Sequence, residues 1–374
     1  MAHIQRRNGR WQARYRDPSG SERTKTFDRK VDAERFLATV EADKVRGAWI
    51  DPRLGRITFG EWALHVEATR TNRRTSTRVR DESLLRNHVL PTFADLRLTA
   101  TQPRHLREWI TELERKSLAP TTIHKAYQIV SRVFEVATTD GRIGQSPCRG
   151  VTLPANRSAE RRYLTADEVN ELATTVDPRF NALVLTAAYT GARFGELAAL
   201  RVKQFDPLRR AMRIEETLTE IRGHLEFGPT KTRASRRKLT VPRFLVEEIV
   251  VHMKAFPDPS QLVFTSPEGG PLRRTNFRRR FWLPAVEASV GAPCTFHDLR
   301  HTHAALLIAE GAHPKVIQER LGHGSIRVTL DTYGHLFDGL DEAAADALND
   351  LFNRSEQYGR ASPRVAELEA AKRA

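Results

Sequence analysis

Cysteines and long apolar runs are scarce in this sequence. Its 374 residues include two cysteines, Cys148 and Cys294, which lie far apart and in no Cys-x-x-Cys or cysteine–histidine spacing. The sequence therefore predicts neither a disulfide framework nor a zinc finger. No apolar run approaches the length of a membrane-spanning helix, and the N-terminus lacks the apolar core of a signal peptide. These absences predict a cytoplasmic protein with no membrane partner.

The charge balance is strongly basic. Lys and Arg total 61 against 46 Asp and Glu, which gives a formal net charge of +15. Such an excess favours a polyanionic partner, although a generally soluble, arginine-rich protein would have the same composition. With 40% hydrophobic residues, a chain of this length is expected to form two or three domains.

The segment 295–336 is predicted to form three short helices. The first ends at Gly311, since glycine is favoured just past a helix C-terminus. The second begins with Pro314, a residue favoured at the first helical position, and ends at Gly322. The third is capped near Ser325.

Polar side chains converge on these helices. His297, Arg300 and His301 are spaced i, i+3 and i+4, so they share one helical face. His323 follows the second helix directly, and Tyr333 belongs to the third. The spacing predicts a small basic site that contains a tyrosine.

Taken together and in order, these motifs resemble the tyrosine recombinase (phage integrase) family. His-Asp-Leu-Arg-His at 297–301, Leu-Gly-His at 321–323 and the following Tyr333 resemble its C-terminal signature. Thr-Gly-Ala-Arg-Phe-Gly-Glu-Leu at 190–197 resembles its first arginine box, and Thr-Lys-Thr at 230–232 the β-hairpin that carries its catalytic lysine. Any one motif alone would be weak, but their joint order is specific. The resemblance implies six catalytic residues: Arg193, Lys231, His297, Arg300, His323 and Tyr333.

Their chemistry suits cleavage of a DNA phosphodiester by a side-chain hydroxyl. Tyr333 would be the nucleophile, and its covalent 3′-phosphotyrosyl link divides one difficult exchange into two easier ones. The planar guanidinium groups of Arg193 and Arg300 suit the non-bridging oxygens, where negative charge grows. Lys231 is expected to protonate the leaving 5′-oxygen.

The two family histidines, His297 and His323, are expected to hydrogen-bond the phosphate or to shuttle the tyrosine proton. His301 and His303 are left out of the catalytic set as core or surface histidines. His297 and His301 could also suggest a zinc pair, but the HExxH glutamate is absent and no third ligand is evident. Neither a metal nor another cofactor is expected.

Taken singly, each residue has a structural alternative. Arg193 could be a surface arginine paired with Glu196, Tyr333 a packed core tyrosine, and His323 a helix cap. The joint spacing of the motifs favours the catalytic interpretation over these alternatives.

The predicted fold is multidomain. A small β-sheet plus helix comes first, then an all-α helical bundle, and then a mainly helical α+β domain with a small antiparallel sheet. By resemblance, residues 1–55 would be an arm-type DNA-binding domain with its linker, and 56–153 a core-binding (SAM-like) domain. Residues 160–352 would be the catalytic domain and 353–374 a C-terminal tail.

In the first part, strands are predicted at 11–16 and 22–27. A helix capped by Asp28 is predicted to follow, with Val31 among its apolar positions. Basic residues along the strands, among them Arg23, would bind arm sites or simply form a solvated face.

In the second part, a capping box at Thr58 and Glu61 opens the first helix. Further helices are predicted at 77–88, 103–115 and 120–139. Five arginines are expected on the outer surface of this bundle: Arg70, Arg73, Arg74, Arg78 and Arg80.

The third part opens with a second capping box, at Thr165 and Glu168. An apolar helical stretch at 180–200 is expected to break at Thr190-Gly191. One small sheet is predicted from strands 212–216, 225–227 and 237–241, followed after the tyrosine by helices at 340–352 and 363–372.

The implied function is site-specific recombination that integrates or excises a phage or mobile element. The expected partners are double-stranded DNA with core and arm attachment sites, a tetramer of the protein on that DNA, and an accessory DNA-bending or excision factor. Its expected location is the cytoplasm, on the nucleoid. Alternatives are a chromosome-dimer resolvase of the same family, a non-catalytic DNA-binding regulator, and a metal-dependent nuclease, which would need a carboxylate cluster that the sequence lacks.

Overall fold

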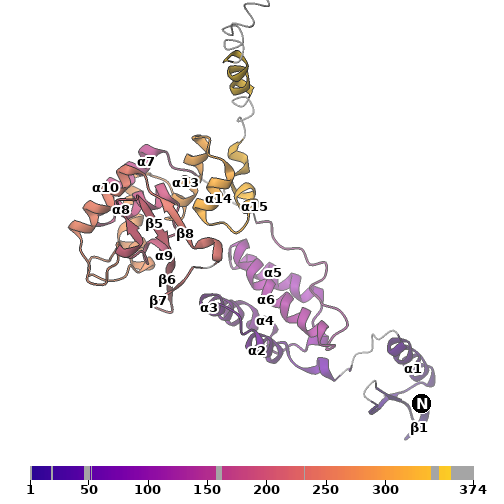
Figure 1. Cartoon of the computed structure of the whole chain (residues 1–374). Coiled ribbons are helices and arrows are strands. Elements are labelled where there is room, and N and C mark those ends of the chain that lie inside the picture. Colours follow the sequence, from indigo (N-terminus) through magenta and orange to yellow (C-terminus); the bar gives the residue numbers. More distant parts are fainter. Residues whose placement is uncertain are drawn as a thin grey trace, which may run out of the picture. The chain divides into compact units, whose positions relative to one another are not determined.

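The chain folds into two compact units, Met1–Ala159 and Glu160–Ala374 (Figure 1), in a computed structural model. The residues that the structure describes are 2–17, 20–45, 51, 53–156, 162–230, 232–337 and 345–354. The predicted multidomain, mainly helical fold with small antiparallel sheets is confirmed. Among the described residues, no helix combines the length and the apolar character needed to cross a bilayer.

The first unit begins with a three-stranded antiparallel sheet and one helix. The strands follow in the order β1 (His3–Arg7), β2 (Arg10–Arg16) and β3 (Glu22–Phe27), and α1 (Lys30–Val45) packs on one face. Side chains alternate along β2, so Ala13 and Tyr15 are buried against α1. The opposite face carries arginines from β1 and β2.

Three details of this region were predicted wrongly. Asp28 lies two residues before α1 and pairs with Arg10 at 3.0 Å, and Val31 is half exposed. Arg23 is paired as well, 2.6 Å from the buried carboxylate of Asp17. Each of these pairings depends on a neighbouring strand or turn, which a helical pattern does not reveal.

A helical bundle completes the first unit. Its elements are η1 (Leu54–Arg56), α2 (Phe59–Thr69), α3 (Thr75–Leu84), the π-helical turn η2 (Leu85–Val89), α4 (Leu90–Phe93), η3 (Leu98–Ala100), α5 (Pro103–Arg115) and α6 (Pro120–Thr139). The capping box is confirmed: the Glu61 amide donates to Thr58 Oγ1 at 3.2 Å and the Thr58 amide to Glu61 Oε2 at 3.1 Å. Helices α5 and α6 have the predicted bounds, whereas α3 begins two residues earlier than predicted.

Two of the arginines predicted on the outer surface of this bundle, Arg70 and Arg73, are engaged within it. Arg73 has a side chain only 10% exposed and bonds to Glu67, and Arg70 pairs with Glu67 at 3.1 Å. Arg80 lies 2.9 Å from the buried carboxylate of Asp81, but its own side chain is 52% exposed, so it stays on the outer surface as predicted. Buried carboxylates need cationic partners, and Arg70 and Arg73 each pair with both Glu67 of α2 and Asp81 of α3, so these two arginines hold the helices together.

The second unit is mainly helical. Its helical elements are α7 (Ala166–Thr175), α8 (Pro178–Thr190), α9 (Phe194–Leu197), η4 (Val202–Gln204), η5 (Arg233–Ser235), α10 (Arg243–Ala255), α11 (Arg274–Phe277), η6 (Arg278–Trp282), α12 (Leu283–Ser289), α13 (Asp298–Ala309), α14 (Pro314–Leu321), α15 (Ile326–Tyr333) and η7 (Gly334–Phe337). The predicted capping box of Thr165 and Glu168 is present, and the break after Thr190 is confirmed.

The strands of this unit form two sheets, not the single one predicted. β4 (Phe205–Asp206), β5 (Ala211–Ile214) and β8 (Arg237–Thr240) pair in that order. β7 (His224–Pro229) instead pairs with β6 (Glu216–Ile221), a strand that the sequence did not predict. The tight turn at Arg222 and Gly223, both with positive φ, folds β6 directly back on β7.

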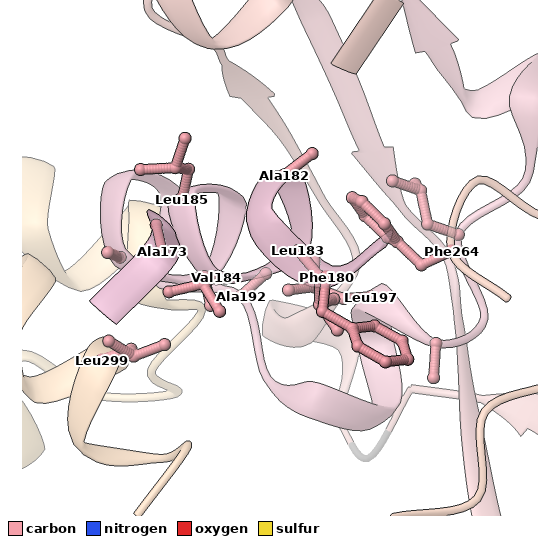
Figure 2. Packing of buried hydrophobic residues seen from close by; sticks show 14 of the residues in the cluster. Ala173, Phe180, Ala182, Leu183, Val184, Leu185, Ala192, Leu197, Phe264 and Leu299 are labelled. Atoms are coloured by element: carbon pink, nitrogen blue, oxygen red, sulfur yellow. The ribbon is translucent and has the colours of Figure 1, made fainter. Parts of the chain in front are cut away.

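Helix α8 forms the centre of the core of this unit. Figure 2 shows Phe180, Leu183 and Val184 of α8 among buried residues that include Phe264 and Leu299, the latter from α13. Because α8 is buried on nearly all sides, the loop that follows it has a fixed position. That loop carries the first arginine of the predicted site.

Near the C-terminus, a helix spans 345–354, and its residues are exposed. It overlaps the helix predicted at 340–352. The predicted helix at 363–372 lies outside the described residues.

Candidate active site

The loop after α8 approaches α13 and α14 closely. Gly191 has a φ of 66°, and a Cβ atom there would lie 2.7 Å from His303 Cδ2 and 2.8 Å from Leu321 Cδ2. Only glycine fits both this backbone conformation and this space. The motif around Arg193 therefore packs directly against α13 and α14, which carry the motifs at 297–301 and 321–323.

Arg193 lies at the N-cap of α9 and shares a carboxylate with a second arginine. Its Nη1 donates to Glu196 Oε1 at 2.7 Å, while Arg237 Nη2 donates to Glu196 Oε2 at 3.0 Å. Burial alone would raise the pKa of Glu196, but the two arginines outweigh it and the net pKa is lowered. The pairing with Glu196, considered as an alternative to catalysis, thus exists. It fixes the guanidinium group of Arg193, whose side chain stays 37% exposed.

Arg237 was not singled out from the sequence. Its Nε donates to the Arg320 carbonyl at 2.6 Å and its side chain is only 6% exposed. A Cβ atom on Gly322 would lie 3.2 Å from Arg237 Cδ, so Arg237 lies beside the turn that leads to His323. In sequence it is one basic residue among several, and its burial comes only from the tertiary fold.

Arg300 joins its own motif at 297–301 to the motifs at 190–197 and 321–323. Its Nη1 donates to the Gly191 carbonyl at 2.6 Å and its Nη2 to the Leu321 carbonyl at 2.5 Å, and the residue is 2% exposed. A guanidinium group has five N–H donors, so these two bonds leave three for another ligand. Burial, with Arg193 and Arg237 nearby, lowers the pKa of Arg300 to about 9.

His297 lies at the N-cap of α13 and lines a cavity of about 900 Å³ together with Arg193. Arg274, Arg278 and Arg279 line the same cavity. Burial lowers the pKa of His297, as do the neighbouring charges of Arg300 and Arg193. The cavity is therefore basic, with a neutral imidazole at neutral pH.

His323 follows Gly322, which ends α14 in the left-handed conformation with a φ of 65°. Its Nδ1 lies 2.9 Å from Thr329 Oγ1. Burial and the charge of Arg300 lower the pKa of His323 to about 4. His323 is thus also neutral at pH 7. With Thr329 donating to Nδ1, the ring proton would sit on Nε2.

Tyr333 is the last residue of α15, and it is 1% exposed. Its hydroxyl lies 2.8 Å from Nδ1 of His301, a histidine that the sequence interpretation left outside the catalytic set. The sequence did contain a signal for including His301 in the site: its i, i+3, i+4 spacing places it on the same helical face as His297 and Arg300.

The two remaining candidates have different outcomes. Lys231 lies outside the described residues, between β7 and η5, so its placement stays a prediction. His303, which the sequence interpretation also left out, is buried, with Nδ1 3.0 Å from the Ala188 carbonyl and Nε2 3.2 Å from Arg320 Nε. It serves packing between α8, α13 and α14.

The described site gathers three arginines, Arg193, Arg237 and Arg300, around one carboxylate, Glu196. Burial and the charges of Arg193 and Arg237 lower the pKa of Arg300, so an arriving anion would stabilise its protonated form. A phosphate would fit this requirement, since arginine forks match its oxygens. The hydroxyl of Tyr333 lies beside this cluster, because it contacts His301, the residue that directly follows Arg300.

Family profiles match most of the chain. The catalytic profile, described as the phage integrase family, matches residues 162–339. A phage integrase N-terminal domain matches 4–46, and a phage integrase N-terminal SAM-like domain matches 58–114. The chain belongs to the tyrosine recombinase (phage integrase) family. It is a site-specific recombinase, and neither a resolvase nor a non-catalytic regulator is favoured.

Relatives of this recombinase extend over nearly its full length. The integrase of Mycobacterium phage L5 is 28% identical over 366 residues, which cover 93% of this chain and 97% of the relative. Among solved structures, the Tn1549 transposon integrase in complex with a circular intermediate DNA has a TM-score of 0.70 at 19% identity, covering 78% of this chain and 99% of that one. A lambda integrase tetramer bound to a Holliday junction has a TM-score of 0.56 at 20% identity, covering 87% and 95%. The likeness to these two structures is one of fold.

Proposed function

We propose that this recombinase integrates or excises a phage or mobile element, with Tyr333 as the nucleophile. Its oxygen attacks the scissile phosphorus and the bond to the 5′-oxygen breaks, which leaves a 3′-phosphotyrosyl link and a free 5′-OH. A second strand's 5′-OH then reverses the exchange without ATP, since the phosphodiester energy is retained in the link.

Arg193 and Arg300 stabilise the charge that develops on the non-bridging oxygens. The support is their geometry: Glu196 fixes the first, and two backbone carbonyls fix the second. Donors fixed before the reaction need no reorganisation during it, which is why they usually supply the largest share of rate enhancement. His297 and His323, both neutral, add hydrogen bonds to the phosphate, and Lys231 protonates the leaving 5′-oxygen.

The observation that carries the proposal is the pair of hydrogen bonds from the Arg300 guanidinium group to the carbonyls of Gly191 and Leu321. It ties three motifs, distant in sequence, around one anion-binding point beside Tyr333.

Mapping the covalent adduct tests this proposal. The substrate is a core-site duplex, identified from the DNA repeats that flank the element, with a nick that lets the freed strand diffuse away. We expect an adduct resistant to detergent, in which mass spectrometry places the nucleotide on the peptide containing Tyr333. A duplex of equal length without the core site is the control. An adduct on another residue, or cleavage without an adduct, would refute the assignment.

The finer organisation is also a proposal. Residues 1–55 would bind arm sites, 56–153 and 160–352 would close on core-site duplex DNA, and 353–374 would be a tail. The tetramer described for lambda integrase on a Holliday junction supports a tetramer here on double-stranded DNA. An accessory DNA-bending or excision factor would assist, and the reaction would take place in the cytoplasm, on the nucleoid.

Arm binding predicts a separable function for the N-terminal region. The sheet face opposite α1 carries Arg7, Arg10, Arg14 and Arg16, because these alternate with residues that face the helix. Deleting residues 1–50 should abolish integration of a supercoiled substrate while leaving weak cleavage of a core site. Full integration by the truncated protein would contradict the assignment.

A point variant provides a finer control for the truncation. The double change Arg7→Ala and Arg16→Ala removes charge from the open face, so it should weaken binding to arm DNA. Lys25→Ala is the matched control, because Lys25 lies over the ring of Phe36 on the α1 side, 4.5 Å from its centroid.

A further inference from the structure

The hydroxyl of the proposed nucleophile is in direct contact with an imidazole that carries no assigned role. Tyr333 Oη and His301 Nδ1 are 2.8 Å apart, within the range for direct proton transfer. The two rings lie with their centroids 5.7 Å apart. Since Tyr333 is 1% exposed, bulk water has little access to this hydroxyl, and its proton must pass to a neighbouring group.

The pair is held from both sides. His301 directly follows Arg300 on α13, and Arg300 is fixed to the Gly191 and Leu321 carbonyls. Tyr333 packs in a buried cluster with Ala304 and Ile308 of α13 and with residues of α14. This packing and the anchoring of Arg300 hold the two rings together, so the contact is a built feature of the site.

The other two histidines are less suited to take this proton. His323 has Nδ1 engaged with Thr329 Oγ1 at 2.9 Å, and burial lowers its pKa to about 4, which makes it a weak base at neutral pH. His297 lines the basic cavity with Arg193, where the phosphate would lie.

We infer that His301 is the general base of the strand-cleavage step, a role that rests on Tyr333 being the nucleophile. For the phenol to donate to Nδ1, the neutral ring carries its own proton on Nε2. On attack, the Tyr333 O–H bond breaks as the Oη–P bond forms, and the proton moves to Nδ1. The P–O5′ bond breaks and the 5′-oxygen takes its proton from the general acid. Religation returns the proton from His301 to Tyr333.

A more acidic phenol at position 333, which needs less help from a base, distinguishes a general-base role of His301 from a structural role. His301→Asn keeps a hydrogen-bonding atom near Nδ1 but has no basic nitrogen. With the natural tyrosine, we expect this variant to cleave a core-site duplex about 10²-fold more slowly or worse, the usual range for a lost general base. With difluorotyrosine incorporated at position 333, whose phenol is more acidic, most of the lost rate should return.

Two controls complete the experiment. Replacing the bridging 5′-oxygen by sulfur relieves the need for an acid, so it should not rescue His301→Asn. His335→Asn removes a similar histidine–tyrosine contact two residues past the nucleophile, where Nε2 lies 3.2 Å from Tyr163 Oη, and it should cleave at a rate within a few-fold of the parent.

Three results would overturn the assignment. His301→Asn could cleave at the parental rate, difluorotyrosine could fail to restore its activity, or His335→Asn could be equally slow. The adduct on Tyr333 in the unmodified protein is scored separately, so failure of this proposal is distinct from failure of the proposed function.

Discussion

Tyr333→Phe should abolish both recombination and the covalent protein–DNA adduct while leaving the fold and DNA binding intact. The change removes one oxygen and keeps the ring that packs against Ala304 and Ile308. Loss of the hydrogen bond with His301 should cost about 1 kcal/mol of folding free energy, a typical value for one such bond. Adduct formation on a nicked core site and the thermal unfolding midpoint measure the two effects.

The matched control is Tyr163→Phe, which removes a hydroxyl from the tyrosine that contacts His335. It should retain the adduct. An adduct that persists in Tyr333→Phe would place the nucleophile elsewhere, for example at Tyr358.

The second large effect separates Arg300 from Lys231. With a natural substrate, Arg300→Ala and Lys231→Ala should both cleave slowly, since a lost charge-stabilising donor usually costs about 10²–10³ in rate. An acid assists only a leaving group that needs a proton, and sulfur needs none. With a bridging 5′-sulfur, Lys231→Ala should approach the parental rate and Arg300→Ala should stay slow.

Arg300 also supports the backbone, so its alanine variant needs a control for folding. Loss of its donors leaves the Gly191 and Leu321 carbonyls buried without these partners, at about 1–3 kcal/mol for each unsatisfied group. Arg300→Lys retains the charge but cannot make the same fork, so it should fold better than Arg300→Ala and still cleave slowly. Lys254→Ala, in α10, controls for loss of an exposed lysine. Rescue of Arg300→Ala by sulfur, with none for Lys231→Ala, would exchange the two assigned roles.

Local sequence signals predicted the elements that depend on local contacts. The capping boxes at Thr58 and Thr165 involve a side chain and an amide three residues apart, so their sequence contains the whole interaction. Gly322 ends α14 because glycine tolerates the left-handed conformation there. Motif order likewise predicted the family and the fold class.

Errors arose where the partner lies outside the element's own periodicity, on a neighbouring helix or strand. Arg73 was predicted on the outer surface because helical spacing does not reveal Glu67 and Asp81 around it. Strand β6 was missed, and β7 was assigned to the wrong sheet, because pairing is chosen by the turn at Arg222 and by the surrounding packing.

The site shows the same division. The sequence by itself determined which residue types are present and that His297, Arg300 and His301 share one helical face, since a helix fixes that geometry. Only the tertiary structure decided that Arg300 bonds to the turn after α8 and to the end of α14, and that His301, rather than another histidine, contacts the hydroxyl of Tyr333. That contact joins residues on α13 and α15, and the packing of helices, not their internal periodicity, sets which side chains meet.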